Sequence, residues 1–117
     1  MNRPFFRHFV IELRADPNDL NSIEWLKEKI ELSLFNLKIK HIKSLYHRFS
    51  PTGISLVYIL SSSHIAVHSW PENNYLHIDL ITCSQNKELE NITNIIESAF
   101  NNRNFTIQEI NYYEKIK

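Results

Sequence analysis

The strongest constraint on the fold is a run of short apolar segments between residues 38 and 83, separated by very short connections. Each segment is rich in Ile, Leu, Val, Tyr or Phe and shows no helical stripe, which favours strands. Such connections fit antiparallel hairpins and are too short for the crossovers that join parallel strands. The run therefore predicts four consecutive antiparallel strands, over 38–49, 54–61, 64–70 and 75–83.

One helix is predicted on each side of this run. Asn21 or Ser22 caps the first helix, which extends to about residue 36, and Glu24 stands three residues after Asn21, at the spacing of a capping box. The second helix opens at Ser84 or Asn86. Both helices carry apolar residues at helical spacing on one side. These residues are Ile23, Leu26, Ile30 and Leu34 in the first helix and Leu89, Ile92, Ile96, Ala99 and Phe100 in the second.

Strands are also predicted at both ends of the chain. Apolar residues alternate with polar or smaller ones in His8–Leu13, and Asp16–Asp19 then predicts a turn. The segment Phe105–Tyr112 supplies a last strand. The resulting order is strand, helix, four strands, helix, strand. It predicts an α+β two-layer sandwich, in which two helices pack on one face of an antiparallel sheet.

Composition limits the partners and the compartment. Lys and Arg total 13, as do Asp and Glu, so no surface-wide field of one sign exists to gather nucleic acid. No apolar run approaches the roughly 20 residues of a membrane helix, and the first residues lack the apolar stretch of a secretory signal. A single cysteine excludes an internal disulfide. We expect one cytoplasmic domain over 1–117, with neither nucleic acid nor membrane as partner.

Strand alternation gathers titratable side chains on one face of the sheet. His64, His68 and Trp70 share a face of their strand, and His77 and Cys83 share a face of the next. Three interpretations of this surface are open. His64, His68 and His77 are a conceivable metal site, since neutral imidazole is a common ligand. The surface is otherwise a solvated or dimer-facing sheet, or it carries catalysis.

The order of residues in this region favours catalysis because it resembles the prokaryotic S-adenosylmethionine decarboxylases. The similar segments are His47–Ser55 (HRFSPTGIS), Ser63–Glu72 (SHIAVHSWPE) and Asp79–Cys83 (DLITC). His8 and Glu12 also match that family, and we expect them to be walls of the site. The resemblance covers nearly the whole chain and implies no metal.

Decarboxylation leaves a carbanion, and no ordinary side chain absorbs its electrons. The resemblance implies that the chain builds the electron sink itself, as a pyruvoyl group made from Ser63. The Ser63 hydroxyl attacks the Ser62 carbonyl and converts the amide into an ester, and elimination then cuts the chain. The products are a β chain of residues 1–62 and an α chain of residues 63–117, which starts with the pyruvoyl group that forms a Schiff base with the substrate.

The resemblance also implies roles for other residues. Ser55 and His68 act in processing, and His68 is expected on the same face as the cleavage end of its strand. Cys83 donates a proton to the carbanion. The implied substrate is S-adenosylmethionine, which is decarboxylated on the way to spermidine. The implied substrate-binding residues are Phe49, Trp70 and Glu72, with Phe49 stacking on the base and Glu72 accepting protons from the ribose hydroxyls. A homodimer with sites at the interface is expected, because one small sheet offers only part of a pocket.

Three positions depart from the usual residues of that family. Ser62 replaces a glutamate, and Leu56 and Ser84 replace glycines. If Leu56 faces the ligand, its side chain reshapes the pocket. Two alternatives stay open: a pyruvoyl-dependent arginine or ornithine decarboxylase on the same scaffold, and an uncleaved, non-catalytic homologue that acts as a partner subunit.

Overall fold

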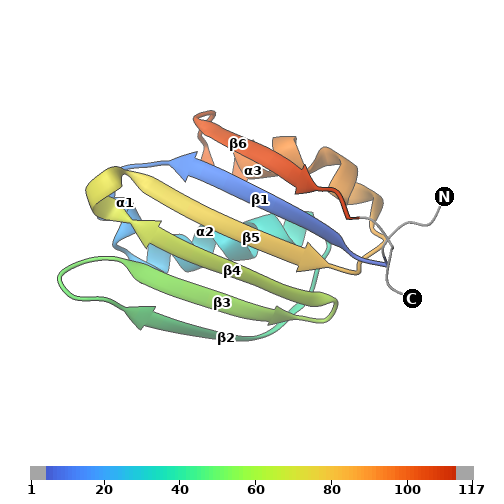
Figure 1. Cartoon of the computed structure of the whole chain (residues 1–117), viewed down its shortest axis with the longest axis horizontal. Coiled ribbons are helices and arrows are strands. Elements are labelled where there is room, and N and C mark those ends of the chain that lie inside the picture. The colour runs from blue at the N-terminus through green and yellow to red at the C-terminus, as the bar shows by residue number, and fades with distance from the viewer. Residues whose placement is uncertain (1–4, 113–117) are drawn as a thin grey trace.

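The structure, a computed structural model, describes residues 5–112 as a curved sheet with helices on one side (Figure 1). The sheet has six antiparallel strands in the order β2-β3-β4-β5-β1-β6. The elements in chain order are β1 (Arg7–Arg14), α1 (Pro17–Leu20), α2 (Ile23–Asn36), β2 (His41–Arg48), β3 (Ile54–Leu60), β4 (Ser63–Trp70), the 3-10 helix η1 (Pro71–Asn73), β5 (Tyr75–Thr82), the 3-10 helix η2 (Lys87–Asn91), α3 (Ile92–Phe100) and β6 (Phe105–Ile110). The predicted α+β sandwich is confirmed.

The core lies between the sheet and the helices α2 and α3. All the apolar residues predicted for the two helical faces are buried there, and they pack against every second residue of the strands. In β4 these residues are Ile65 and Val67, and in β5 they are Leu76, Ile78 and Leu80. Burial of this apolar surface is the main favourable term in folding. It also fixes the register, because a slip of one residue would turn these side chains to the other face.

The predicted turn at Asp16–Asp19 is wrong, because most of it forms the one-turn helix α1. The Asp16 carboxylate caps this helix by accepting a hydrogen bond of 2.8 Å from the Asn18 amide. Pro17 occupies the first turn, where its missing N–H costs nothing.

The capping box at Asn21 is also wrong. Ser22 is the N-cap of α2, and its hydroxyl accepts from the Trp25 amide at 3.1 Å. The side chain of Asn21 instead accepts a hydrogen bond of 3.1 Å from the amide of Gly53 in the β2–β3 loop. A contact between segments so far apart leaves no signal in local spacing.

The second long helix starts later than predicted. Residues 84–86 form an irregular loop, η2 follows, and α3 begins at Ile92. The Ser84 hydroxyl accepts from the Asn86 amide at 3.1 Å, and the Asn86 side chain donates to the carbonyl oxygen of Leu37 at 3.2 Å. These bonds tie the loop to the end of α2 and offer its polar groups an alternative to helix. Strands β2 and β6 are shorter than predicted by two residues or more, since β2 begins at His41 and β6 ends at Ile110, and β3 and β5 each end one residue earlier than predicted.

Gly53, the only glycine in the chain, gives a test of the β2–β3 loop. Its φ is +106°, and an added Cβ would lie 3.2 Å from the carbonyl oxygen of Ser69. We expect Gly53→Ala to lower the free energy of unfolding by about 1–2 kcal/mol, because L-residues are strained at this φ. Denaturant unfolding checks this value. Thr52→Ala in the same loop is the matched control, and an equal loss in both variants would contradict the explanation.

Candidate active site

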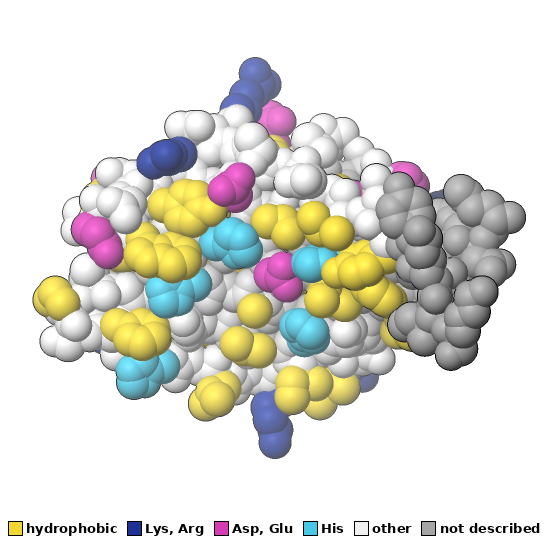
Figure 2. Space-filling view, in the orientation of Figure 1, with side chains coloured by type: hydrophobic (Ala, Val, Ile, Leu, Met, Phe, Trp, Pro, Cys, Tyr) yellow, Lys and Arg dark blue, Asp and Glu magenta, His cyan; other side chains and the backbone are white. Residues whose placement is uncertain are grey.

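The face of the sheet that the helices leave uncovered carries several of the predicted site residues. Figure 2 shows hydrophobic and histidine side chains gathered over this face, which we call the open face. One row of its side chains crosses all six strands, because directly paired residues point the same way. The row consists of His47, Ser55, His68, His77, Glu12 and Thr106.

His68 is the centre of this row. Its Nδ1 lies 2.5 Å from the Ser55 hydroxyl oxygen on the neighbouring strand β3. The imidazole also lies among aromatic rings, with ring centroids 4.0 Å from Trp70 and 5.5 Å from Phe49. When Nδ1–H donates to Ser55, the lone pair of Nε2 stays free to accept a proton. The structure thus brings four predicted residues together, namely Ser55, His68, Phe49 and Trp70.

The surroundings of His68 favour its neutral form. Burial lowers the pKa of His68 below its usual 6.5, and His77 on the next strand lowers it further. The carboxylate of Glu72 in η1 acts in the opposite direction. A neutral imidazole is the form that accepts a proton.

Ser63 lies at the other end of β4, in the hairpin that joins β3 to β4. Leu60 pairs with Ser63, so Ser61 and Ser62 are the two residues of the turn. Ser63 has a φ of +133°, a conformation that L-residues rarely adopt. Holding a residue there costs about 1–3 kcal/mol. The predicted cleavage residue is therefore strained in the folded chain.

The carbonyl group before Ser63 is also held in place. Its oxygen, on Ser62, accepts a hydrogen bond of 2.8 Å from the backbone amide of Cys83, which directly follows β5. An amide donor at this position stabilises negative charge on the oxygen when a nucleophile attacks the carbonyl carbon. The Cys83 side chain is exposed. Ser62, Ser63 and Cys83 thus form a second cluster, with the predicted nucleophile, the carbonyl that it is expected to attack and a hydrogen-bond donor in adjacent positions.

The two clusters lie far apart within one chain. Ser63 and His68 are five residues apart on β4, which corresponds to roughly 16 Å along a strand. Strand alternation does not place the Ser63 side chain, because a φ of +133° departs from strand geometry, so the expectation that His68 shares a face with the cleavage end stays a prediction. Ser63 pairs with the fully buried Thr82, whereas His68 pairs with His77 on the open face. One protomer therefore holds two separate clusters of predicted site residues, which we call half-sites.

The departures from the family pattern fall in different places. Leu56 is fully buried in the core, on the side of the sheet opposite to Ser55 and His68. Its side chain therefore does not point to the open face. Ser84 lies next to Cys83, and its amide donates to the Thr82 hydroxyl at 3.1 Å. The leucine thus leaves the surface around His68 unchanged.

Residues at the start of the chain make contacts that spacing did not predict. The His8 side chain lies between the Asp79 carboxylate, at 2.7 Å, and the Tyr112 hydroxyl, also at 2.7 Å. The Tyr75 hydroxyl donates to Glu12 at 2.6 Å, and burial together with this bond raises the pKa of Tyr75 to about 12. Strand alternation does place the side chains of Tyr75 and Asp79 on the open face. The sequence could therefore predict the face on which these contacts lie, but not the contacts themselves.

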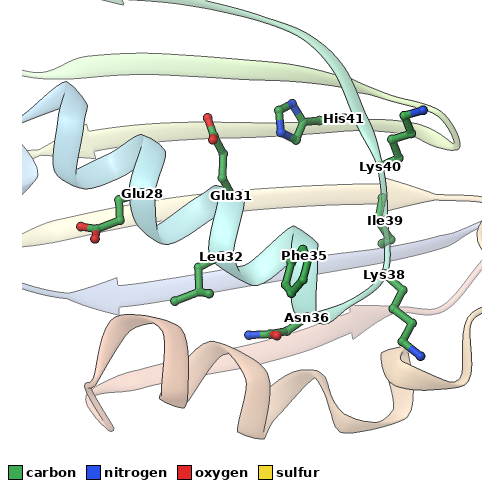
Figure 3. Close-up of a pocket in the computed structure, with 9 residues that line it drawn as sticks. All are labelled: Glu28, Glu31, Leu32, Phe35, Asn36, Lys38, Ile39, Lys40 and His41. Carbon is green, nitrogen blue, oxygen red and sulfur yellow. The ribbon is translucent and has the colours of Figure 1, made fainter.

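A metal site and a membrane-spanning helix are two alternatives that the described residues do not support. Within residues 5–112, no three His, Cys, Asp or Glu side chains come close enough to hold a metal ion. In the same range, no helix is long and apolar enough to cross a membrane. A groove of about 1030 Å³ lies between α2 and the segment that joins α2 to β2 (Figure 3), and none of the predicted site residues lines it.

Comparison with known proteins identifies the family of the chain. The model of the family described as S-adenosylmethionine decarboxylase matches residues 7–112. The chain belongs to this family. Its relatives include the S-adenosylmethionine decarboxylase proenzyme of Pelotomaculum thermopropionicum, 30% identical over 105 residues, which are 89% of this chain and 83% of that protein. The corresponding proenzyme of Thermococcus gammatolerans is 36% identical over 105 residues, 88% of this chain and 73% of that protein.

A solved structure shows the same fold. The crystal structure of the adenosylmethionine decarboxylase from Aquifex aeolicus superposes with a TM-score of 0.79, at 24% identity, over 99% of this chain and 98% of that one. The predicted family, and with it the expectation of a decarboxylase, are confirmed by these matches.

The strain at Ser63 can be measured with two variants that both lack the attacking hydroxyl. Glycine adopts the observed φ without steric cost, whereas alanine does not. We expect Ser63→Gly to be more stable than Ser63→Ala by about 1 kcal/mol or more, since it relieves the strain. Denaturant unfolding of the two purified proteins measures the difference. Equal stabilities would show that the backbone at residue 63 is relaxed.

Proposed function

We propose that this protein is a self-cleaving, pyruvoyl-dependent decarboxylase that converts S-adenosylmethionine into decarboxylated S-adenosylmethionine and CO2. The observation that carries the proposal is the geometry of the hairpin. Ser63 is held at a φ of +133°, and the carbonyl before it accepts a hydrogen bond from the Cys83 amide. Both features favour attack of the Ser63 hydroxyl on the Ser62 carbonyl.

Cleavage begins with an acyl shift. The Ser63 oxygen forms a bond to the carbonyl carbon of Ser62, the carbon–nitrogen bond breaks, and the hydroxyl proton ends on the freed nitrogen. An amide is more stable than an ester, so the shift needs a driving force, and relief of the strain at Ser63 supplies part of it. The negative charge that develops on the Ser62 oxygen strengthens its bond to the Cys83 amide.

Elimination completes the cut. A base removes the Cα proton of Ser63, the ester oxygen leaves as the new carboxylate of Ser62, and water replaces the nitrogen, which departs as ammonia. The products are residues 1–62 and 63–117, the second beginning with the pyruvoyl group. We assign the base to His68, because its lowered pKa keeps it neutral and Ser55 orients its ring.

The residues around the hairpin fit a pyruvoyl group at position 63. The pyruvoyl carbonyl supplies the electron sink that amino-acid decarboxylation requires. Cys83 follows the residue that pairs with Ser63, so its thiol is placed to deliver a proton to the carbon that loses CO2. A positioned acid of this kind is worth about 10² to 10⁴ in rate.

The aromatic cluster near His68 fits the adenosyl and sulfonium parts of the substrate. Phe49 and Trp70 offer ring faces to a flat base and to a cation, each contact being worth roughly 1 kcal/mol when shielded from water. Glu72 lies in η1, which directly follows β4, and is placed to accept protons from the ribose hydroxyls. Its negative charge also complements the sulfonium.

The two half-sites support a homodimer in which each active site takes residues from both protomers. A two-fold axis that stacks the open faces with their strands reversed places the Ser63 end of one protomer over the His68 end of the other. The open face carries the exposed apolar side chains Leu45, Val57 and Ile59, which such stacking would bury. We propose that the dimer acts in the cytoplasm and that its product serves spermidine synthesis.

Mass spectrometry of intact, freshly purified protein tests the cut. We expect two fragments of roughly 7 kDa each, from a chain of 14.0 kDa cut near its middle. Ser63→Ala should stay whole and inactive, since the attacking oxygen is gone. Cys83→Ala should be cut but lose activity by about 10² or more. One unbroken wild-type species after long incubation would contradict the proposal and favour a non-catalytic homologue. If the cut protein released CO2 from arginine and not from S-adenosylmethionine, the proposed substrate would be wrong.

Co-expression of two defective variants tests the shared site. In a dimer of one Ser63→Ala chain and one His68→Ala chain, one composite site lacks both residues and the other is intact. We therefore expect cleavage of the His68→Ala chain only, and about a quarter of the wild-type number of complete sites after random pairing. Each variant expressed alone is the control. If His68 acts on its own chain, the mixture will stay uncut, and the proposed arrangement is wrong.

A further inference from the structure

Thr82 is a buried polar residue that the mechanism above does not use. It is the last residue of β5, it is fully buried, and it pairs with Ser63 across the ladder. Its hydroxyl oxygen lies 2.8 Å from the Ser62 hydroxyl and accepts a hydrogen bond of 3.1 Å from the Ser84 amide. A buried hydroxyl with two hydrogen-bond partners is fixed in direction. Its partners, Ser62 and Ser84, lie next to Ser63 and Cys83 in the chain.

The contacts of Thr82 and Cys83 hold Ser62 at two points. The Cys83 amide binds the Ser62 carbonyl oxygen at 2.8 Å, and the Thr82 hydroxyl binds the Ser62 side chain. A single hydrogen bond leaves a turn residue free to rotate about that bond. A second bond, made to the Ser62 side chain by the preceding residue Thr82, restricts this rotation and so helps to orient the peptide that is cut.

We propose that Thr82 is a positioning residue for self-cleavage, and that it acts through the hydroxyl of Ser62. It keeps the Ser62 carbonyl on the Cys83 amide while the Ser63 oxygen adds to the carbon and the carbon–nitrogen bond breaks. The short Ser62 side chain reaches the Thr82 hydroxyl directly, at 2.8 Å. This inference rests on the proposed cleavage between Ser62 and Ser63.

Two substitutions separate positioning from packing. Thr82→Val keeps the shape of the side chain and removes the hydroxyl, whereas Thr82→Ser keeps the hydroxyl and removes the methyl group. A packing role predicts that serine is the more harmful change. A positioning role predicts that valine slows cleavage and that serine restores it.

The experiment follows cleavage over time in freshly synthesised full-length protein, by denaturing gel and mass spectrometry. We expect Thr82→Val to slow cleavage roughly 10- to 100-fold, the range that follows from a misplaced reacting group, and Thr82→Ser to stay within about threefold of the wild type. Ser62→Ala should slow cleavage to the same extent as Thr82→Val. The double variant should be no slower than either single one, because both changes break the same contact.

The outcomes are separable from those of the proposed function. If the wild type is never cut, the cleavage proposal and this inference fail together. If the wild type is cut and both Thr82→Val and Ser62→Ala are cut at the same rate, only the role of Thr82 is overturned. Circular dichroism shows whether Thr82→Val is folded. If it is not, Ser62→Ala decides the case, since it removes the same contact from the partly exposed side of the pair.

Discussion

The structure depends on a sheet that is covered by helices on one face only. Apolar residues at every second position of the strands fill the space under α2 and α3, and this burial sets the register of all six strands. The alternate positions of the strands point to the open face, and their side chains do not pack in this core. They carry His8, Glu12, Ser55, His68 and His77, so the same alternation that builds the core also composes the open face, where His68 and Ser55 of the predicted site lie.

Strain and hydrogen bonding act at the same peptide link. The turn between β3 and β4 has only two residues, and Ser63, directly after it, adopts a backbone conformation that side chains disfavour. The neighbouring end of β5 supplies the Cys83 amide to the preceding carbonyl. The strands on both sides hold Ser63 in this strained conformation. The stability of the whole sheet therefore offsets the free energy that the strain costs.

Much of this could be predicted from the sequence, because strand period, helical spacing and short connections are local signals. The strands, the two core-facing helices and the residues of the open face follow from them. The partners of Asn21, Asn86 and His8 do not, because each contacts a residue more than 30 positions away. The positive φ of Ser63 does not follow from these local signals either, because it depends on how the hairpin is held between the neighbouring strands.

The order of the strands has a consequence for a chain cut between Ser62 and Ser63. The first piece would hold β1, β2 and β3, and the second β4, β5 and β6. In the sheet, β1 lies between β5 and β6, so a strand of the first piece is enclosed on both sides by strands of the second. The two pieces are interlocked by backbone pairing and by a common core. Scission would therefore create a new chain terminus inside an intact sheet, and the pieces would part only when the whole domain unfolds.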